Sequence, residues 1–389
     1  MFRRFAAALS LVVVCPWLAG VEIEPIPAGR YAVATTNLEV HAQPDAKAMF
    51  DFLNGKATAD GTKYLTDILV HPEAVPTLQV EIPNDRKRYG GHAGQRLPLV
   101  LLVVYPTTRD NPRADYKYPY TETGDALFTR MQQPGDKPLF ADPTAKYPLV
   151  VYSGGYNTHG LWHLAHLKAL ASHGYIVVDM FHGDGRGADF PLNLGLRVVE
   201  LRATLDFILA HPDFGPAIDA NRIGAEGASG GGHTVLAAMG GTDPTGRIAD
   251  GADPRIKAGF GLVPFMGGSM GIWPFKMDFW FFGEDHAGLK PMRRPFLGVY
   301  GGKDSNVPPE GVEGGVRAMG GPATAVMLDK EQHLVSDASN LDIRTWETLF
   351  FDAWLKDDAT ARKKLETGTS VRGGVPDHKT IQQGAGAPH

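Results

Sequence analysis

The chain has 389 residues, of which 43% are hydrophobic and 21% are charged, and its formal net charge is −5. This composition is typical of a globular protein and argues against a largely disordered one. No basic run is longer than three residues, so a nucleic-acid-binding function is not expected. The length allows one large domain or two domains of ordinary size.

The first twenty residues have the pattern of a secretory signal peptide. Arg3 and Arg4 precede an apolar run over residues 5–14, which is too short to cross a bilayer. Leu18-Ala19-Gly20 then offers a cleavage site of small residues. The alternatives are a buried first helix or an uncleaved anchor. The pattern predicts a periplasmic or secreted protein with no stable membrane span after cleavage.

The single cysteine of the chain is Cys15, inside this leader. A cleaved protein would therefore have no disulfide, no thiol nucleophile and no cysteine-ligated metal. Lipid attachment at Cys15 is a further alternative, but Val14 is a poor residue to precede a modified cysteine.

Beyond the leader, short β-rich apolar runs alternate with helical patterns, which predicts a mainly parallel sheet covered by helices. The expected strands are residues 30–40, 98–105, 148–152, 175–180, 222–226, 256–263, 295–300 and 323–328, and the expected helices lie near 63–70, 161–173, 196–210, 234–239 and 345–355. Residues 41–95 and 106–146 are expected to be irregular insertions. Together these patterns indicate one domain over residues 21–366, followed by a flexible tail over 367–389.

An aromatic segment over residues 266–292 interrupts the alternation, with six aromatic residues between positions 273 and 282. One interpretation is a small cap over a binding site, in which Trp273 and Trp280 contact an apolar substrate. The alternative is that these rings pack against the sheet.

Residues 224–234, GAEGASGGGHT, form a glycine-rich run between a predicted strand and a predicted helix. From Gly227 the run fits a phosphate-binding loop, except that His233 occupies the lysine position. The run also fits G-x-S-x-G, the turn that presents a nucleophilic serine, here Ser229. A histidine is shorter than lysine and mostly neutral at pH 7, and a secreted protein meets little ATP. We therefore favour the nucleophile.

A serine nucleophile needs a base, and the base needs a carboxylate to orient it. In this architecture the chain order is Ser, acid, His. Asp304 follows the predicted strand 295–300, and His333 follows the strand 323–328. Asp329 is a rival acid, but it lies only four residues before the histidine. We therefore predict Ser229, Asp304 and His333 as the catalytic residues.

The loop after strand 148–152 reads SGGYNTHG. Its glycines allow the backbone to approach a substrate closely. An oxyanion hole needs one N–H from the residue after the nucleophile, Gly230, and one from this earlier loop. Tyr156 is the expected second donor, and Gly155 is the alternative and a substrate-binding candidate.

Four stretches together resemble the α/β-hydrolase superfamily, most of all its dienelactone hydrolase and platelet-activating-factor acetylhydrolase-like branch. They are YSGGYNTHG, LASHGYIVVDMFHGDGR, NRIGAEGASGGGHTVLAA and VYGGKDSNVPP with its downstream His333, and they span residues 95–355. Three features depart from that branch: Gly154-Gly155 replaces a His-Gly pair, the strand after the nucleophile helix carries no acid, and position 229 is serine where dienelactone hydrolases have cysteine.

The resemblance implies an α/β-hydrolase fold with a sheet of about eight strands, a serine-hydrolase triad, and no cofactor or metal. The expected substrate is a small-molecule or lipid ester. A serine peptidase or amidase on the same fold is the alternative, and a non-catalytic binding protein on a hydrolase scaffold is a third hypothesis. The sequence leaves the oligomeric state open.

Several polar residues are expected to have structural roles. His163 and His166 lie three residues apart on a predicted helix without a third metal ligand, so a packing role is favoured over metal binding. His182 and Asp184 follow a strand, where they shape a turn or line the pocket. Glu226 precedes Ser229 by three residues, so its side chain either faces the site or is paired behind it.

Overall fold

The computed structural model describes residues 21–38, 78–117, 127–132, 136–156, 158, 160–182, 184, 190–246, 248, 252–270, 277–279 and 281–382. The leader over residues 1–20, the expected helix at 63–70, and both Trp273 and Trp280 lie outside these ranges.

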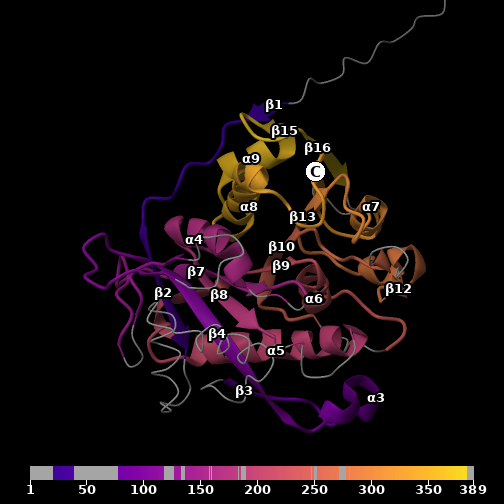
Figure 1. The fold of residues 1–389 in the computed structure, drawn as a ribbon, viewed down its shortest axis with the longest axis horizontal. Coiled ribbons are helices and arrows are strands. Elements are labelled where there is room, and N and C mark those ends of the chain that lie inside the picture. The colour runs from indigo at the N-terminus through magenta and orange to yellow at the C-terminus, as the bar shows by residue number, and fades with distance from the viewer. Residues whose placement is uncertain are drawn as a thin grey trace, which may run out of the picture.

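A single large sheet organises the described part of the chain (Figure 1). Its strands are β2 (Ala32–Leu38), β3 (Leu78–Glu81), β4 (Arg96–Thr107), β7 (Tyr147–Ser153), β8 (Ile176–Phe181), β9 (Ile218–Ala228), β10 (Ile256–Leu262), β13 (Phe296–Gly301), β14 (Ala323–Leu328) and β16 (Asp377–Gln382). Their order is β16-β14-β13-β10-β9-β7-β8-β4-β2, with β3 also on β4. The six strands from β8 to β14 are mutually parallel, and β2, β3, β4 and β16 add antiparallel partners at the two ends.

The central strands are apolar almost throughout, because helices cover both faces of the sheet. All seven residues of β7 and all six of β8 are buried. One face packs against α5 (Phe190–Ala210), α6 (Gly230–Ala238) and α7 (Pro309–Ala318). The other packs against α4 (Leu164–Ser172), α8 (Asn340–Leu355) and α9 (Ala359–Thr367). In Figure 1, α5 and α6 lie together, apart from α4 and α8. The result is a mixed α/β fold with a mostly parallel sheet between two helical layers.

Each of the eight expected strands corresponds to a strand of this sheet; β14 has the expected ends, and the other seven have shifted ends. Helices α7 and α9 were not expected, and strand β3 and the short helix α3 (Arg86–Tyr89) lie within residues 41–95, which were expected to be irregular. Two further short pairs lie outside the main sheet: β5 (Tyr116–Lys117) with β6 (Leu127–Phe128), and β11 (Gly268–Met270) with β12 (Met277–Phe279).

The interpretation of residues 367–389 as a flexible tail is wrong for most of that segment. β15 (Gly368–Val371) pairs with β1 (Val21–Ile23), and β16 pairs antiparallel with β14. The indole N–H of Trp346 donates to Asp377 over 3.1 Å, so α8 is also tied to this end of the chain. The segment is mostly polar in composition, and backbone pairing of β15 and β16 holds it, together with the buried side chain of Val371.

The aromatic segment 266–292 contains the β11–β12 hairpin, and part of it is core. Phe281 and Phe282 are 4% and 0% exposed. The Phe282 ring stacks on His233 with 4.6 Å between centroids. For these two rings the packing alternative holds, and the cap interpretation does not.

Candidate active site

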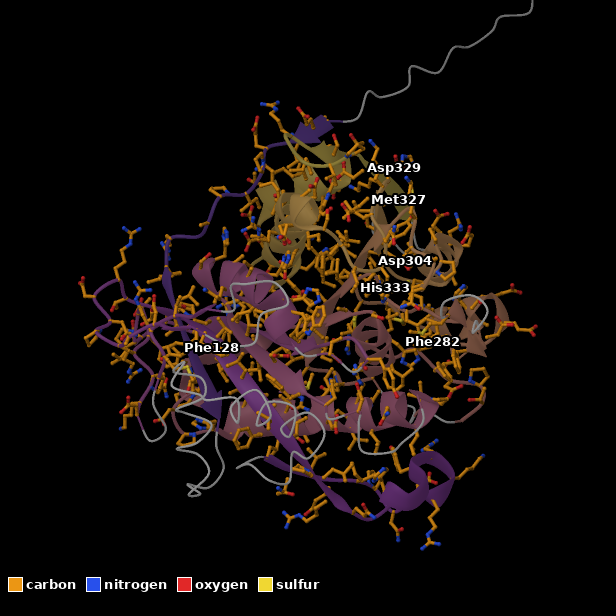
Figure 2. All side chains as sticks on the ribbon, viewed as in Figure 1. Phe128, Phe282, Asp304, Met327, Asp329 and His333 are labelled. Carbon is orange, nitrogen blue, oxygen red and sulfur yellow. The ribbon has the colours of Figure 1, made fainter. Side chains whose placement is uncertain are left out.

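The residues predicted to act chemically meet at the carboxyl edge of the parallel strands. Ser229 follows β9 directly, Asp304 lies three residues after β13, and His333 lies five residues after β14. Parallel strands end at a common edge, so loops far apart in sequence converge there. Figure 2 shows Asp304 and His333 close together at this edge.

Ser229 occupies a strained turn between β9 and α6. Its φ is 52° and its ψ is −118°, a positive-φ conformation that residues other than glycine rarely adopt. Two hydrogen bonds hold the turn: Ser229 N–H donates to the carbonyl of Leu262 over 2.9 Å, and Ser229 carbonyl accepts from Phe265 N–H over 2.9 Å. The strain therefore projects the hydroxyl from the end of the strand, at the amino end of a helix.

The glycines around Ser229 are required by close packing. A Cβ on Gly227 would lie 2.3 Å from the backbone of Gly231. A Cβ on Gly231 would lie 1.9 Å from the carbonyl oxygen of Ser153, and one on Gly232 would lie 2.5 Å from Pro264. Each of these contacts is too short for any side chain. The glycine run thus lets α6 begin directly against β9 and against the loop after β7.

Ser229, His333 and Asp304 form one hydrogen-bonded line. His333 Nε2 lies 2.9 Å from Ser229 Oγ, and His333 Nδ1 lies 2.7 Å from Asp304 Oδ2. The Ser229 residue is 7% exposed, the Asp304 side chain is fully buried and the His333 side chain is 17% exposed. A buried acid, a histidine and a serine in this order can move a proton off the serine.

Asp304 is held as an acceptor. Its Oδ1 accepts from the backbone N–H groups of Asn306 and Val307, both over 2.8 Å, which leaves Oδ2 directed to His333. A carboxylate facing Nδ1 requires a proton on that nitrogen. The tautomer is therefore set so that Nε2 can accept from Ser229.

The loop after β7 lies against Ser229. A Cβ on Gly155 would lie 3.6 Å from the Ser229 Cβ. Gly230 begins α6, and the first N–H groups of a helix have no partner inside it. The structure therefore brings both predicted sources of oxyanion donors, Gly230 and the segment Gly155–Tyr156, next to Ser229.

A second serine–histidine–acid line lies beneath this loop. Ser153 Oγ is 2.8 Å from His182 Nε2, and His182 Nδ1 is 2.6 Å from Glu200 Oε2. These residues are 0%, 3% and 1% exposed. Ser153 also lies within β7 rather than on a strained turn. A substrate cannot reach it, so this line is structural, whereas Ser229 lies at the strand end.

A buried arginine completes the layer under the loop. Arg197 donates to the carbonyl oxygens of Gly154, over 2.6 Å, and Gly155, over 2.8 Å, and it is paired with Asp184. Sequence reasoning missed Arg197 and Glu200. The available signal was a pair of charges within the buried apolar stripe of α5, where Leu194, Val198 and Leu201 are buried. Charged residues are rarely buried unless they are paired.

Glu226 is paired behind the nucleophile rather than facing the site. Its carboxyl lies close to that of Glu347 from α8, on the face of the sheet opposite α6. Burial raises the pKa of Glu226 to about 7 and holds the pKa of Glu347 well above its usual range. The pair therefore retains a proton near neutral pH.

Two further buried histidines, His166 and His233, have packing roles. Burial lowers the pKa of His233 to about 3 and that of His166 to about 4, and His166 Nε2 lies 2.9 Å from Asn340 Oδ1. Across the described ranges, no group of three or more His, Cys, Asp or Glu side chains is arranged to hold a metal ion.

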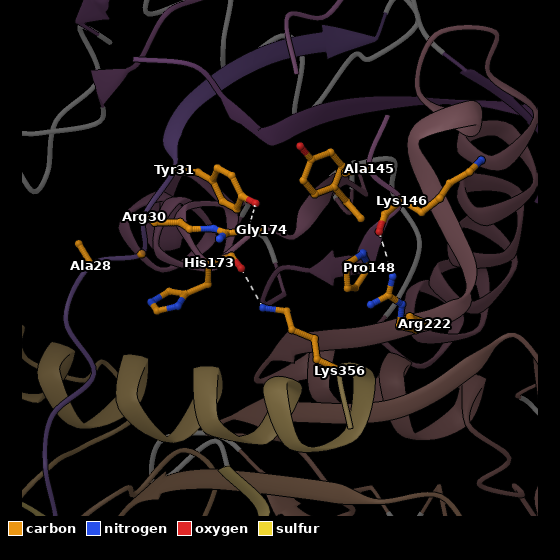
Figure 3. Close-up of a pocket in the computed structure, with 12 residues that line it drawn as sticks. Ala28, Arg30, Tyr31, Ala145, Lys146, Pro148, His173, Gly174, Arg222 and Lys356 are labelled. Carbon is orange, nitrogen blue, oxygen red and sulfur yellow. Dashed lines mark hydrogen bonds between the residues drawn. The ribbon is translucent and has the colours of Figure 1, made fainter. Parts of the chain in front are cut away.

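A hollow of about 610 Å³ lies away from this site, near the amino ends of β7 and β8 (Figure 3). Several cations line it, but they are engaged by neighbouring groups. Arg222 pairs with Asp219 at 2.6 Å, and Lys356 pairs with Asp352 at 2.7 Å. The hollow contributes no group to the chemistry at Ser229.

No helix in the described residues combines the length and apolar character needed to cross a membrane. No protein-family model matches the chain, and no curated protein matches it in sequence. The residues and geometry of the site are therefore the basis for the function proposed below.

Proposed function

We propose that this protein is a serine hydrolase of α/β-hydrolase fold that cleaves carboxylic esters. One observation carries the proposal: the Ser229 hydroxyl, on a positive-φ turn between a strand and a helix, is in line with His333 and Asp304. Such strain is costly and persists where the surrounding structure maintains it, which is typical of functional sites.

In the proposed reaction, Ser229 Oγ attacks the ester carbonyl carbon while His333 Nε2 accepts the hydroxyl proton. Asp304 stabilises the resulting imidazolium through Nδ1. The N–H groups of Gly230 and of Tyr156 or Gly155 stabilise the negative charge on the former carbonyl oxygen. His333 then donates its proton to the leaving alcohol, and a water molecule releases the acyl group by the same steps.

The proposed substrate is a small-molecule or lipid ester, encountered in the periplasm or outside the cell. The leader pattern over residues 1–20 motivates this location. Leu334 supports an apolar substrate, because it follows His333 directly and is 74% exposed. Its apolar side chain is therefore available to contact an acyl chain or an alcohol group of a substrate at Ser229.

The test uses wild type, Ser229→Ala and Asp304→Asn with p-nitrophenyl esters of increasing acyl length and with matched anilides. We expect Ser229→Ala to abolish ester hydrolysis, and Asp304→Asn to reduce kcat by about 10⁴-fold. Ser370→Ala, on β15, is the matched control and should behave as wild type. Faster cleavage of anilides than of esters would indicate an amidase instead.

A fluorophosphonate probe with peptide mapping tests the nucleophile directly. The probe should label Ser229, and it should leave the buried Ser153 unmodified. A folded wild-type protein that is neither labelled nor active on esters would refute the hydrolase proposal and favour a binding protein.

A further inference from the structure

One buried guanidinium holds two consecutive carbonyl groups of the loop beside Ser229. Arg197 Nη1 donates to Gly154 O over 2.6 Å, and Nη2 donates to Gly155 O over 2.8 Å. Arg197 is 1% exposed, so no solvent competes for these bonds. Gly155 O also accepts from Thr158 N–H over 3.1 Å and Thr158 Oγ1 over 3.0 Å. Both peptide planes are therefore fixed from one side.

Fixing the carbonyls also fixes the N–H groups. In a trans peptide the C=O and the following N–H point in opposite directions. The carbonyl of Gly154 shares its peptide with the N–H of Gly155, and the carbonyl of Gly155 shares its peptide with the N–H of Tyr156. With both carbonyls turned to Arg197, both N–H groups are turned away from it, in a loop that lies against Ser229.

We propose that Arg197 is a positioning residue for the oxyanion hole: by holding the Gly154 and Gly155 carbonyls, it presents the N–H groups of Gly155 and Tyr156 to the oxygen of a Ser229 adduct. This inference rests on the hydrolase function proposed above. Oxyanion donors accelerate a reaction only if they are oriented before charge develops. Arg197 supplies that orientation without touching the substrate.

The residue type fits this role. Asp184 holds the guanidinium from the other side, with Arg197 Nε 3.0 Å from Oδ1 and a second contact between Nη2 and Oδ2. Arginine presents several donors in one rigid plane and can hold two carbonyls and a carboxylate together, whereas a lysine ammonium is a point donor. Because the Arg197–Asp184 pair is neutral overall, its effect is one of orientation rather than of added charge.

A second anchor acts on the residue just before the two glycines. Burial lowers the pKa of His182 below its ordinary value, which favours the neutral ring. Its Nδ1–H then donates to the Glu200 carboxylate, and its Nε2 accepts from the Ser153 hydroxyl. Arg197 and Glu200 are three residues apart on α5 and share one face of that helix. Helix α5 thus holds Ser153, Gly154 and Gly155 in succession.

The test removes the charge pair as a unit, because deleting Arg197 alone would leave the buried Asp184 carboxylate without its arginine counter-charge. Arg197→Met/Asp184→Asn should lower kcat by about 10²–10³-fold per active site, the cost of one lost oxyanion donor. Active sites are counted by fluorophosphonate titration, which corrects for misfolded protein. KM for p-nitrophenyl butyrate should stay within about threefold, because the donors act on the transition state. The single variant Arg197→Lys, which keeps the positive charge, should have a kcat almost as low as that of the double variant.

The matched control is Arg222→Met/Asp219→Asn. That pair also joins an arginine, an aspartate and a backbone carbonyl, that of Lys146, but it lies on the amino half of β9. It should retain the wild-type kcat per active site. A value within threefold of wild type for Arg197→Met/Asp184→Asn would overturn the proposal.

If the Arg197 double variant does not fold, the crystal structure of wild type with a phosphonate on Ser229 decides. The phosphoryl oxygen is expected about 2.7–3.1 Å from the N of Gly230 and of Tyr156 or Gly155, with both carbonyls still on Arg197. A phosphoryl oxygen that contacts neither loop N–H would overturn the proposal. Wild type that neither hydrolyses esters nor reacts with the probe is a separate result, which rejects the hydrolase function and this inference with it.

Discussion

Replacing Gly231 by alanine tests the contact between the start of α6 and the loop after β7. The added Cβ would lie 1.9 Å from Ser153 O and 2.7 Å from Gly154 O, whereas real Cβ atoms essentially never come within 3.0 Å of another heavy atom. The difference, 3.0 minus 1.9, requires that the loop and the helix separate by at least 1.1 Å. Neither contact is with the far end of a flexible side chain, so the backbone itself must move.

That displacement lies between Ser229 and the proposed oxyanion donors. A misplacement of about 1 Å at a catalytic site costs about 10²-fold in rate, so kcat should fall by at least that factor. Overpacking typically destabilises a core by about 1–3 kcal/mol, which corresponds to a decrease of several degrees in Tm. The kcat per titrated site with p-nitrophenyl butyrate and the Tm from differential scanning calorimetry provide the two measurements.

The matched control is Gly91→Ala, because a Cβ on Gly91 would meet no atom within 4 Å. It should leave kcat and Tm unchanged. If Gly231→Ala behaves like this control, helix α6 and the loop are not in contact as described, and the reasoning about the glycine run is wrong.

Three further predictions concern other parts of the molecule. Burial raises the folded-state pKa values of Glu226 and Glu347 above their unfolded values, so the folded protein keeps a proton that the unfolded chain releases, and Tm should fall as the pH rises from about 5 to about 8. The double variant Glu226→Gln/Glu347→Gln should show a flatter dependence of Tm on pH, and a slope equal to that of wild type would refute the prediction. Truncation after Val371 removes β16 and the partner of the Trp346 indole, so Tm should decrease, whereas removal of residues 383–389 alone should not change it. Leu334→Ser should raise KM for p-nitrophenyl octanoate several-fold and leave KM for p-nitrophenyl acetate unchanged. Leu139→Ser, at another exposed leucine, is the control, and an octanoate KM of Leu334→Ser equal to that of wild type would exclude Leu334 from substrate contact.

The sequence determined eight strands of the sheet and the order of the site residues, because both depend on local patterns. Apolar runs such as PLVLLVVY mark strands that are buried on both faces, whatever their neighbours are. Gly227, Ser229 and Gly231 could be recognised as a nucleophile turn because their spacing is short. Asp304 and His333 then followed from the chain order and from the positions of the preceding strands.

Other elements depend on partners that are distant in sequence. Helix α7 contains three glycines, which disfavour a helix locally, yet Val312 and Val316 are buried in the core and Gly315 lies against Met266. Strand β16 is polar and has no periodic apolar pattern, so only its pairing with β14 reveals it. In both cases tertiary packing overrides a local preference.

The layer beneath the site was decided only by the tertiary structure. His182 and Asp184 could be placed after a strand, but their partners Glu200 and Arg197 lie on a helix further along the chain. Glu226 could be placed beside the nucleophile turn, yet only the position of α8 determines that it pairs with Glu347 behind the sheet. Local sequence thus determines which groups stand at the strand ends. Helices from other parts of the chain decide which of those groups are oriented, neutralised or shielded. Burial and hydrogen-bond partners arise only when the layers assemble.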